Sequence, residues 1–277
     1  MKFITRIIDV LLYTSLFTAC CATGLCMATE RLVDMASPPL NNPLHLLVFG
    51  STLVVYNTPR LIRRPYGIIR TQQINRPWFY VFFYTGLALT GLALPGLSRQ
   101  VMVAAGLLGL FAFAYFLPVL PFKNKKRLRD VGGLKITVLA GVWTTATSIL
   151  PMIYHQKNSG DYPYEILLRF VFIFTLCIVF DIRDMQADMR NNIRTLPHRM
   201  GIENSYRLIN ITLGLFALLS IIQYFRYYLA LRLAGALLTV VITWIVVTYL
   251  RKKPADRAYI ILADGMMLMY SILVLLN

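Results

Sequence analysis

Three aspartates with helical spacing form the cluster in this chain that is best suited to chemistry. Asp181, Asp184 and Asp188 follow the apolar run 170–180, and on a continuing helix their spacing places them on one face. The chain has 12 acidic residues, and three of them fall within this short stretch. Neighbouring carboxylates repel one another unless a cation neutralises them, and a hard cation such as Mg²⁺ prefers carboxylate oxygens together with phosphate. The stretch therefore predicts a Mg²⁺ site, and the alternative is an ordinary solvated helix end.

The elements that must position these carboxylates are membrane helices. Hydrophobic residues make up 57% of the chain and the mean hydropathy is +0.62, which is typical of a polytopic membrane protein. The apolar runs do not alternate with polar residues, so they predict helices and not strands. We expect one all-α membrane domain over residues 1–277, a nine-transmembrane-helix bundle. The expected helices are 5–27, 39–57, 77–97, 100–121, 133–153, 163–182, 205–225, 229–250 and 257–276.

The net charge of +16 is distributed as a topology signal. If the apolar segments alternate in direction, most of the 28 Lys and Arg residues lie on the same side of the membrane as the N-terminus. Basic loops are retained in the cytoplasm, so we expect a cytoplasmic N-terminus and an outside C-terminus in a bacterial plasma (inner) membrane. This distribution argues against nucleic acid as a partner. It gives a cytoplasmic face that attracts lipid head groups or phosphates.

The stretch DIRDMQADMRNNIRTLPHRMG, residues 181–201, resembles the second aspartate-rich motif of the UbiA superfamily of intramembrane prenyltransferases. In that motif DxxDxxxD is followed by Thr-Leu-Pro and Gly. The resemblance implies that the three aspartates hold Mg²⁺ on the diphosphate of an isoprenyl diphosphate. The first aspartate-rich motif of the family falls at the end of the second apolar segment. This chain has Asn57 there, but Thr58, Leu61 and Pro65 occupy the acidic positions.

Basic residues are the predicted ligands of the diphosphate. Guanidinium groups bind diphosphate in a bidentate manner but cannot hold a metal. The family has a Lys-Arg pair in the loop before the fifth segment, which corresponds here to Lys126 and Arg127. Lys135, one turn into that segment, either extends to the membrane interface or faces a central cavity as a phosphate ligand. The predicted diphosphate-binding set is Asn57, Arg60, Arg64, Lys126, Arg127, Lys135 and Arg194.

Two functions remain open from the sequence. The resemblance implies a prenyltransferase that moves an isoprenyl group from its diphosphate to an aromatic or other lipid-soluble acceptor, with Asp181, Asp184 and Asp188 as the catalytic residues. Metal and basic charge would stabilise the departing diphosphate, and aromatic side chains would shelter the carbocation. The aromatic candidates are Tyr56, Tyr115, Trp143 and Phe180. The missing acids of the first motif favour the alternative, a non-catalytic protein of the same fold that binds an isoprenoid or diphosphate lipid.

Other polar residues in the apolar segments have less specific interpretations. Asp264 lies inside the last apolar segment, where a carboxylate is costly, so it is either functional or a hydrogen-bond partner of another helix. The four cysteines lie in apolar runs and are expected to be small core residues that form neither disulfides nor a zinc site. The three histidines are too widely spaced in the sequence to predict a site. These residues are Cys20, Cys21, Cys26, Cys177, His45, His155 and His198.

Overall fold

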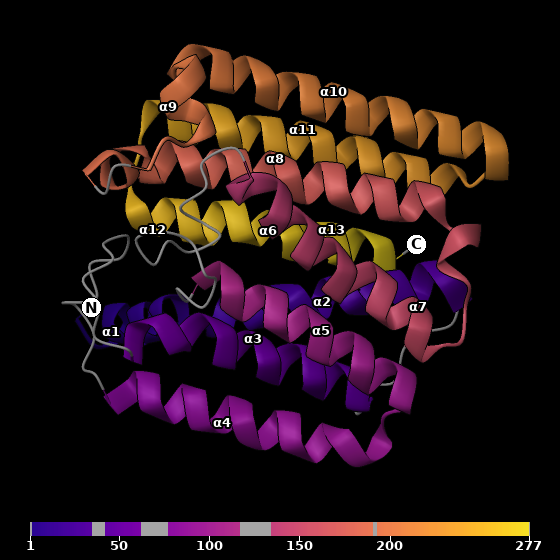
Figure 1. Cartoon of the computed structure of the whole chain (residues 1–277). Coiled ribbons are helices and arrows are strands. Elements are labelled where there is room, and N and C mark those ends of the chain that lie inside the picture. Colours follow the sequence, from indigo (N-terminus) through magenta and orange to yellow (C-terminus); the bar gives the residue numbers. More distant parts are fainter. Residues whose placement is uncertain (1, 35–41, 62–76, 117–133, 191–192, 277) are drawn as a thin grey trace.

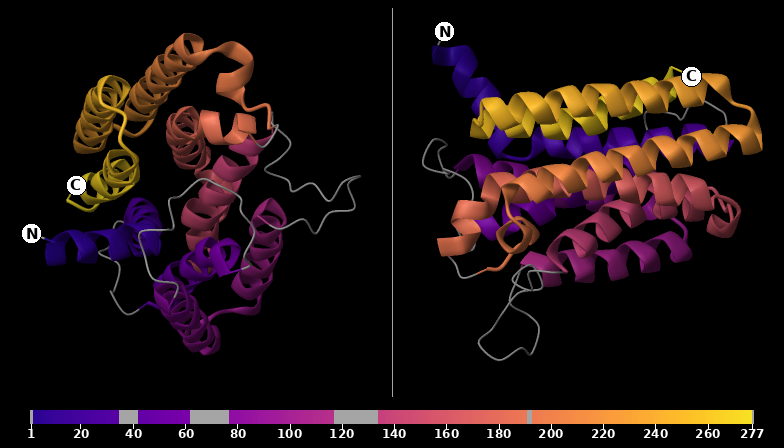
Figure 2. Two further views of the ribbon diagram at one scale, coloured as in Figure 1. Left: turned by 90° about the vertical axis from the view of Figure 1, so that its left-hand side faces the viewer. Right: turned by 90° about the horizontal axis from the view of Figure 1, so that it is seen from above.

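A computed structural model describes residues 2–34, 42–61, 77–116, 134–190 and 193–276, and their secondary structure is helical. Long helices run side by side along one direction (Figure 1), and a view along that direction shows a single bundle (Figure 2). The helices are α1 (Lys2–Tyr13), α2 (Leu16–Asp34), α3 (Pro43–Leu61), α4 (Pro77–Ala93), α5 (Arg99–Phe116), α6 (Lys135–Thr144), α7 (Leu150–Tyr154), α8 (Pro163–Arg190), α9 (Leu196–Met200), α10 (Ile202–Tyr227), α11 (Ala230–Lys252), α12 (Asp256–Ala258) and α13 (Gly265–Leu275).

Several of these helices have the length and composition of membrane spans. Within the described ranges, 6 helical segments are long and apolar enough to cross a bilayer. Two of them contain a wider π-helical turn: η4 (Thr145–Ile149) joins α6 to α7, and η6 (Tyr259–Asp264) joins α12 to α13. The chain is thus an all-α, multi-pass integral membrane protein, as its hydropathy predicts. The 6 spans are Leu16–Val33, Pro77–Gly96, Lys135–Tyr154, Ile202–Tyr227, Ala230–Lys252 and Asp256–Leu275.

The expected first helix, 5–27, is wrong as a single element. The structure divides it into α1 and α2, with Ser15 between them at a φ of 60°. The amide of Asn57 stabilises this break, because its Nδ2 donates to the carbonyl oxygen of Thr14 at 2.9 Å. Hydropathy is continuous through the break, so the apolar pattern gives no sign of it.

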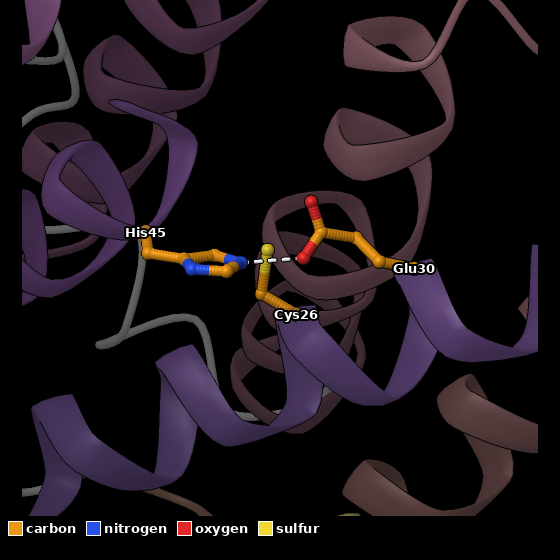
Figure 3. Close-up of side chains that lie close together, drawn as sticks. All are labelled: Cys26, Glu30 and His45. Atoms are coloured by element: carbon orange, nitrogen blue, oxygen red, sulfur yellow. Dashed lines mark hydrogen bonds and ion pairs between the residues drawn. The ribbon is translucent and has the colours of Figure 1, made fainter. Parts of the chain in front are cut away.

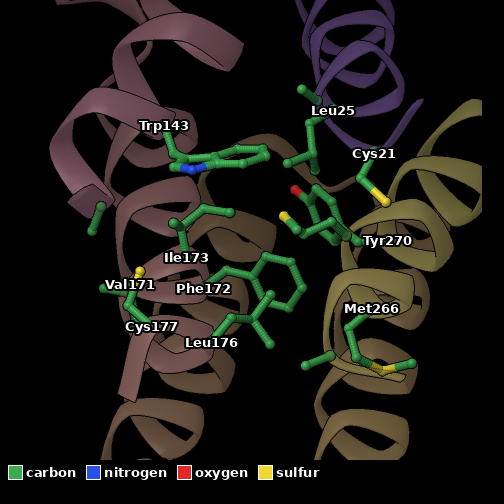
Figure 4. Close-up of a cluster of buried hydrophobic side chains, with 14 of the residues drawn as sticks. Cys21, Leu25, Trp143, Val171, Phe172, Ile173, Leu176, Cys177, Met266 and Tyr270 are labelled. Atoms are coloured by element: carbon green, nitrogen blue, oxygen red, sulfur yellow. The ribbon is translucent and has the colours of Figure 1, made fainter. Parts of the chain in front are cut away.

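Helix α8 packs against α6 and α10 and contributes much of the buried core. Its apolar side chains point toward residues of α2 and α13 (Figure 4). Phe172 of α8 lies 5.3 Å from Tyr270 of α13 and 5.8 Å from Phe216 of α10, measured between ring centroids. These contacts fix the position of α8, whose C-terminal turns carry the aspartates.

Helices α3 and α4 pack closely through two glycines. A Cβ added to Gly50 would lie 2.7 Å from the carbonyl oxygen of Gly86, and a Cβ on Gly86 would lie 2.7 Å from that of Gly50. Small residues allow membrane helices to approach in this way. The contact holds α4 against the helix that ends with Asn57 and Arg60.

Candidate functional site

The aspartate trio lies on the last turns of α8, which continues as a helix through all three positions. The helix ends on the side of the bundle where α9 and α12 lie (Figure 1). Asp181 and Asp188 are buried, at 3% and 0% exposure, and Asp184 is partly buried. The solvated helix end that was the alternative is therefore excluded for two of the three residues.

Lys135 occupies the space between the two buried carboxylates. Its Nζ lies 2.7 Å from Asp181 Oδ1 and 2.6 Å from Asp188 Oδ2. Lys135 is the first residue of α6, and the packing of α6 on α8 brings it to the trio. The expectation that Lys135 extends to the membrane interface is wrong, because its side chain is buried. Its role as a phosphate ligand stays a prediction.

The third carboxylate pairs with its neighbour in the sequence. Arg183 donates from Nε to Asp184 Oδ1 at 2.7 Å and from Nη2 to Oδ2 at 3.0 Å. The guanidinium also lies 4.8 Å from the ring centroid of Phe180. Each of the three aspartates therefore contacts a cation of the chain itself, and the two cations balance two of the three negative charges.

The donor set of the trio is compatible with Mg²⁺. Carboxylate oxygens are hard ligands, and Asp181 Oδ2 is buried without a hydrogen-bond partner among the described residues. Within those same ranges, the trio does not bring three ligand atoms within 4.8 Å of one another. A metal held here would thus depend on additional oxygen atoms, such as those of a phosphate.

Asn57 is buried and its amide is engaged within the bundle. Its Nδ2 donates to the carbonyl oxygens of Thr14 and Leu53, and its Oδ1 accepts from Arg60 Nη1 at 3.3 Å. The Arg60 guanidinium lies 5.5 Å from the ring centroid of Phe79. Asn57 therefore orients Arg60 at the end of α3, on the same side of the bundle as the trio (Figure 1).

The remaining predicted diphosphate ligands are described only in part. Arg194 is exposed in the short segment between α8 and α9. Arg64, Lys126 and Arg127 lie outside the described residues. Their predicted roles stay predictions.

An apolar cavity of about 300 Å³ lies along the middle of α3 and beside the end of α6 that is away from Lys135. Its walls come from α2, α3, α4, α5, α6, η4 and the start of α7, together with Leu94 and Leu97, and its lining is mostly hydrophobic. Two of the expected aromatics, Tyr56 and Trp143, belong to the wall, and Trp143 Nε1 donates to the Tyr56 hydroxyl at 3.1 Å. The cavity has the character of a site for an apolar chain.

Asp264 lies in η6 and joins two helical units. Thr18 Oγ1 of α2 donates to Asp264 Oδ2 at 2.9 Å, and Cys21 Sγ donates to the carbonyl oxygen of Asp264 at 3.2 Å. These contacts match the interpretation of Asp264 as a hydrogen-bond partner of another helix.

Sequence reasoning missed a second polar cluster at the opposite end of the bundle. His45 and His155 both contact the carboxylate of the buried Glu30. The sequence spacing of these two histidines predicted no site, and the structure brings both to one carboxylate. Glu30 lies in an apolar helix, and the cost of burying a carboxylate there is the signal that could have indicated the cluster.

Comparisons with known proteins agree with the sequence motif. No family model matches the chain. A digeranylgeranylglyceryl phosphate synthase from Sulfolobus acidocaldarius is 29% identical over 171 residues, covering 57% of this chain and 60% of that protein. The match thus spans less than two thirds of the relative.

Two solved structures share the fold over nearly the whole chain. A UbiA homolog from Archaeoglobus fulgidus, solved with GPP and Mg²⁺, superposes with a TM-score of 0.66 at 11% identity, over 97% of this chain and 100% of that one. A digeranylgeranylglyceryl phosphate synthase structure gives a TM-score of 0.53 at 15% identity and covers 100% of both chains. The chain thus shares the fold of a UbiA homolog and is similar in sequence to a digeranylgeranylglyceryl phosphate synthase, in agreement with the resemblance of residues 181–201 to the second aspartate-rich motif of the UbiA superfamily.

Proposed function

We propose that this protein transfers an isoprenyl group from an isoprenyl diphosphate to an aromatic or other lipid-soluble acceptor. The observation that carries the proposal is that one helix has a charged cluster at its start and lines an apolar cavity farther along. Lys135, bound to two aspartates, begins α6, and the cavity-lining Trp143 follows eight residues later, about 12 Å along the helix. An isoprenyl diphosphate, with a charged head and an apolar tail, matches a charged region at one end of α6 and an apolar cavity farther along it.

The charged end would bind the diphosphate and stabilise the charge that develops when it departs. Arg60, Lys135 and Arg183 are basic residues at this end of the bundle, and fixed cations in a site of low dielectric constant stabilise such charge strongly. Asp181, Asp184 and Asp188 would hold Mg²⁺. When bound, the ion supplies Lewis-acid neutralisation of the diphosphate oxygens. The A. fulgidus homolog, solved with GPP and Mg²⁺, supports this assignment.

The cavity would hold the isoprenyl chain and exclude water. Excluding water is necessary, because water would otherwise capture an allylic carbocation before the acceptor does. Tyr56 and Trp143 form an edge-to-face pair with ring centroids 6.4 Å apart. Aromatic rings at this position could stabilise positive charge through their π-systems.

The proposed topology retains nine membrane spans in a single domain over residues 1–277. Besides the 6 segments above, we propose that α3, α5 and α8 cross the membrane. The basic loops support a cytoplasmic N-terminus and an outside C-terminus in a bacterial inner membrane. Reporter fusions after Arg129 and after Asn277 should then give signals from opposite sides, and signals from one side would overturn this topology.

The second candidate is a non-catalytic binder of an isoprenoid or diphosphate lipid. It is favoured by the missing acids of the first motif and by the pairing of the trio with Lys135 and Arg183. Purified protein incubated with geranyl diphosphate, Mg²⁺ and an extract of native lipids separates the two functions. A prenyltransferase releases inorganic diphosphate, and Asp181→Asn should abolish the release. Binding without release would establish the second candidate.

A further inference from the structure

At the end of the bundle opposite the aspartates, three side chains bring metal-binding atoms together. Cys26 and Glu30 are one turn apart on α2, and His45 points toward them from the start of α3 (Figure 3). Their Sγ, carboxylate oxygen and ring nitrogen all lie within 4.8 Å of one another, and all three residues are buried. In the part of the chain that the structure describes, this is the group of His, Cys, Asp and Glu residues that meets this spacing.

The carboxylate of Glu30 is held in a fixed direction. Asn42 Nδ2 donates to Glu30 Oε1 at 2.8 Å, and His155 Nε2 lies 2.8 Å from the same oxygen. The other oxygen, Oε2, contacts His45 Nε2. Outer partners of this kind orient carboxylates that bind metals. One oxygen of Glu30 is therefore anchored, and the other lies beside His45 on the side where the sulfur of Cys26 is found (Figure 3).

We propose that Cys26, Glu30 and His45 form a transition-metal site, with Zn²⁺ as the ion that fits best. Zn²⁺ accepts thiolate, imidazole and carboxylate ligands, and three protein ligands leave one position for water or another molecule. Mg²⁺ is a poor fit, because it prefers oxygen ligands. The proposal revises the expectation that the cysteines take no part in a metal site.

The charges of the three buried ligands favour a divalent ion. A thiolate from Cys26 and a carboxylate from Glu30 together carry two negative charges, which a divalent cation neutralises. The loaded site therefore adds no net charge to the apolar interior, where unpaired charges are costly. His155, whose side chain is 24% exposed, connects the cluster to the surface and gives the ion a path of entry.

Cobalt binding to the full chain tests the site. Protein purified in detergent and stripped with chelator is titrated with Co²⁺, which gives a thiolate charge-transfer band when a cysteine is a ligand. We expect this band, a stoichiometry of about one ion per chain, and displacement by Zn²⁺ but not by Mg²⁺. Cys26→Ser should remove the band and weaken binding by about tenfold or more. Cys177→Ser, which changes a buried cysteine on α8, should leave both unchanged.

A second variant keeps the test decisive if Cys26→Ser fails to fold. The triple variant Cys20→Ser, Cys21→Ser, Cys177→Ser leaves Cys26 as the one cysteine in the chain. A thiolate band in this variant supports the site. Absence of the band in both the wild type and this variant, or a band that survives Cys26→Ser, would overturn it and leave a hydrogen-bonded cluster.

Discussion

The ammonium of Lys135 lies 2.6 Å from a carboxylate oxygen of Asp188, although the two residues are 53 positions apart. The same ammonium lies 2.7 Å from Asp181. It joins the start of α6 to the end of α8 and places a positive charge among the residues proposed to hold Mg²⁺. The proposed metal would therefore compete with this ion pair for the carboxylate oxygens.

Replacing Lys135 by Met should destabilise the protein strongly. The substitution removes the cation shared by Asp181 and Asp188, and breaking a buried ion pair from one side typically costs about 3–5 kcal/mol. The thermal unfolding midpoint in detergent should fall, and added Mg²⁺ should restore part of it, because the ion can take the place of the ammonium. Lys135→Arg, which keeps the charge, is the control. An unchanged midpoint in Lys135→Met would contradict the stabilising role of this ion pair.

Asp184→Asn and Arg60→Ala should weaken binding of geranyl diphosphate in different ways. A carboxylate acts on diphosphate through a metal, whereas a guanidinium acts directly. Asp184→Asn should therefore reduce the affinity about tenfold, or ~1.4 kcal/mol, mainly when Mg²⁺ is present. Arg60→Ala should reduce it with or without metal. Binding is followed by thermal shift with Mg²⁺ or with chelator. If Asp184→Asn binds as tightly as the wild type in both conditions, the aspartates take no part in binding the diphosphate.

Gly109→Phe should shorten the isoprenoid that the protein accepts. Gly109 lines the apolar cavity, and a Cβ there would meet nothing within 4 Å, so the first atom of a larger side chain has open space and the ring would reduce the volume of the cavity. Binding of a long isoprenyl diphosphate should weaken by about tenfold relative to geranyl diphosphate. Gly91→Phe is a matched control, because Gly91 also has open space but is absent from the cavity wall. Equal losses for both chain lengths would show that this cavity does not hold the tail.

Gly50→Ala should lower stability by about 1–3 kcal/mol, because the new methyl group would lie 2.7 Å from the backbone of α4. Neither backbone can retreat without separating the two helices. The unfolding midpoint in detergent measures the effect. Gly91→Ala, with no neighbour within 4 Å, should keep the wild-type midpoint. A midpoint for Gly50→Ala equal to that of Gly91→Ala would mean that the contact between the helices is looser than described.

The sequence predicted an all-α membrane chain and the shared helical face of the three aspartates. The spacing of Asp181, Asp184 and Asp188 is local, so helical periodicity placed them on one face of α8. The partner of two of them, Lys135, comes from another helix, and its position depends on how α6 packs against α8. Hydropathy contains no information on that packing.

Two further structural features could not be predicted from the sequence for related reasons. The break at Ser15 depends on a backbone dihedral angle that apolar composition does not encode. The contact between Glu30 and His155 joins residues 125 positions apart, and it forms only after α2 and α7 are placed side by side. Apolar runs locate helices, but they do not show which polar side chains those helices bring together.

The π-helical turn η4 sets the rotational phase between the two ends of one membrane span. Lys135, at one end of Lys135–Tyr154, faces the aspartates, and His155, just past the other end, faces Glu30. If Thr145–Ile149 wound as a regular α-helix with the same number of residues, one end of the segment would turn by about 100° relative to the other. Lys135 and His155 could then no longer both reach their partners. The extra residue of the π-helical turn therefore lets the two ends of one helical segment contact polar clusters at opposite ends of the bundle.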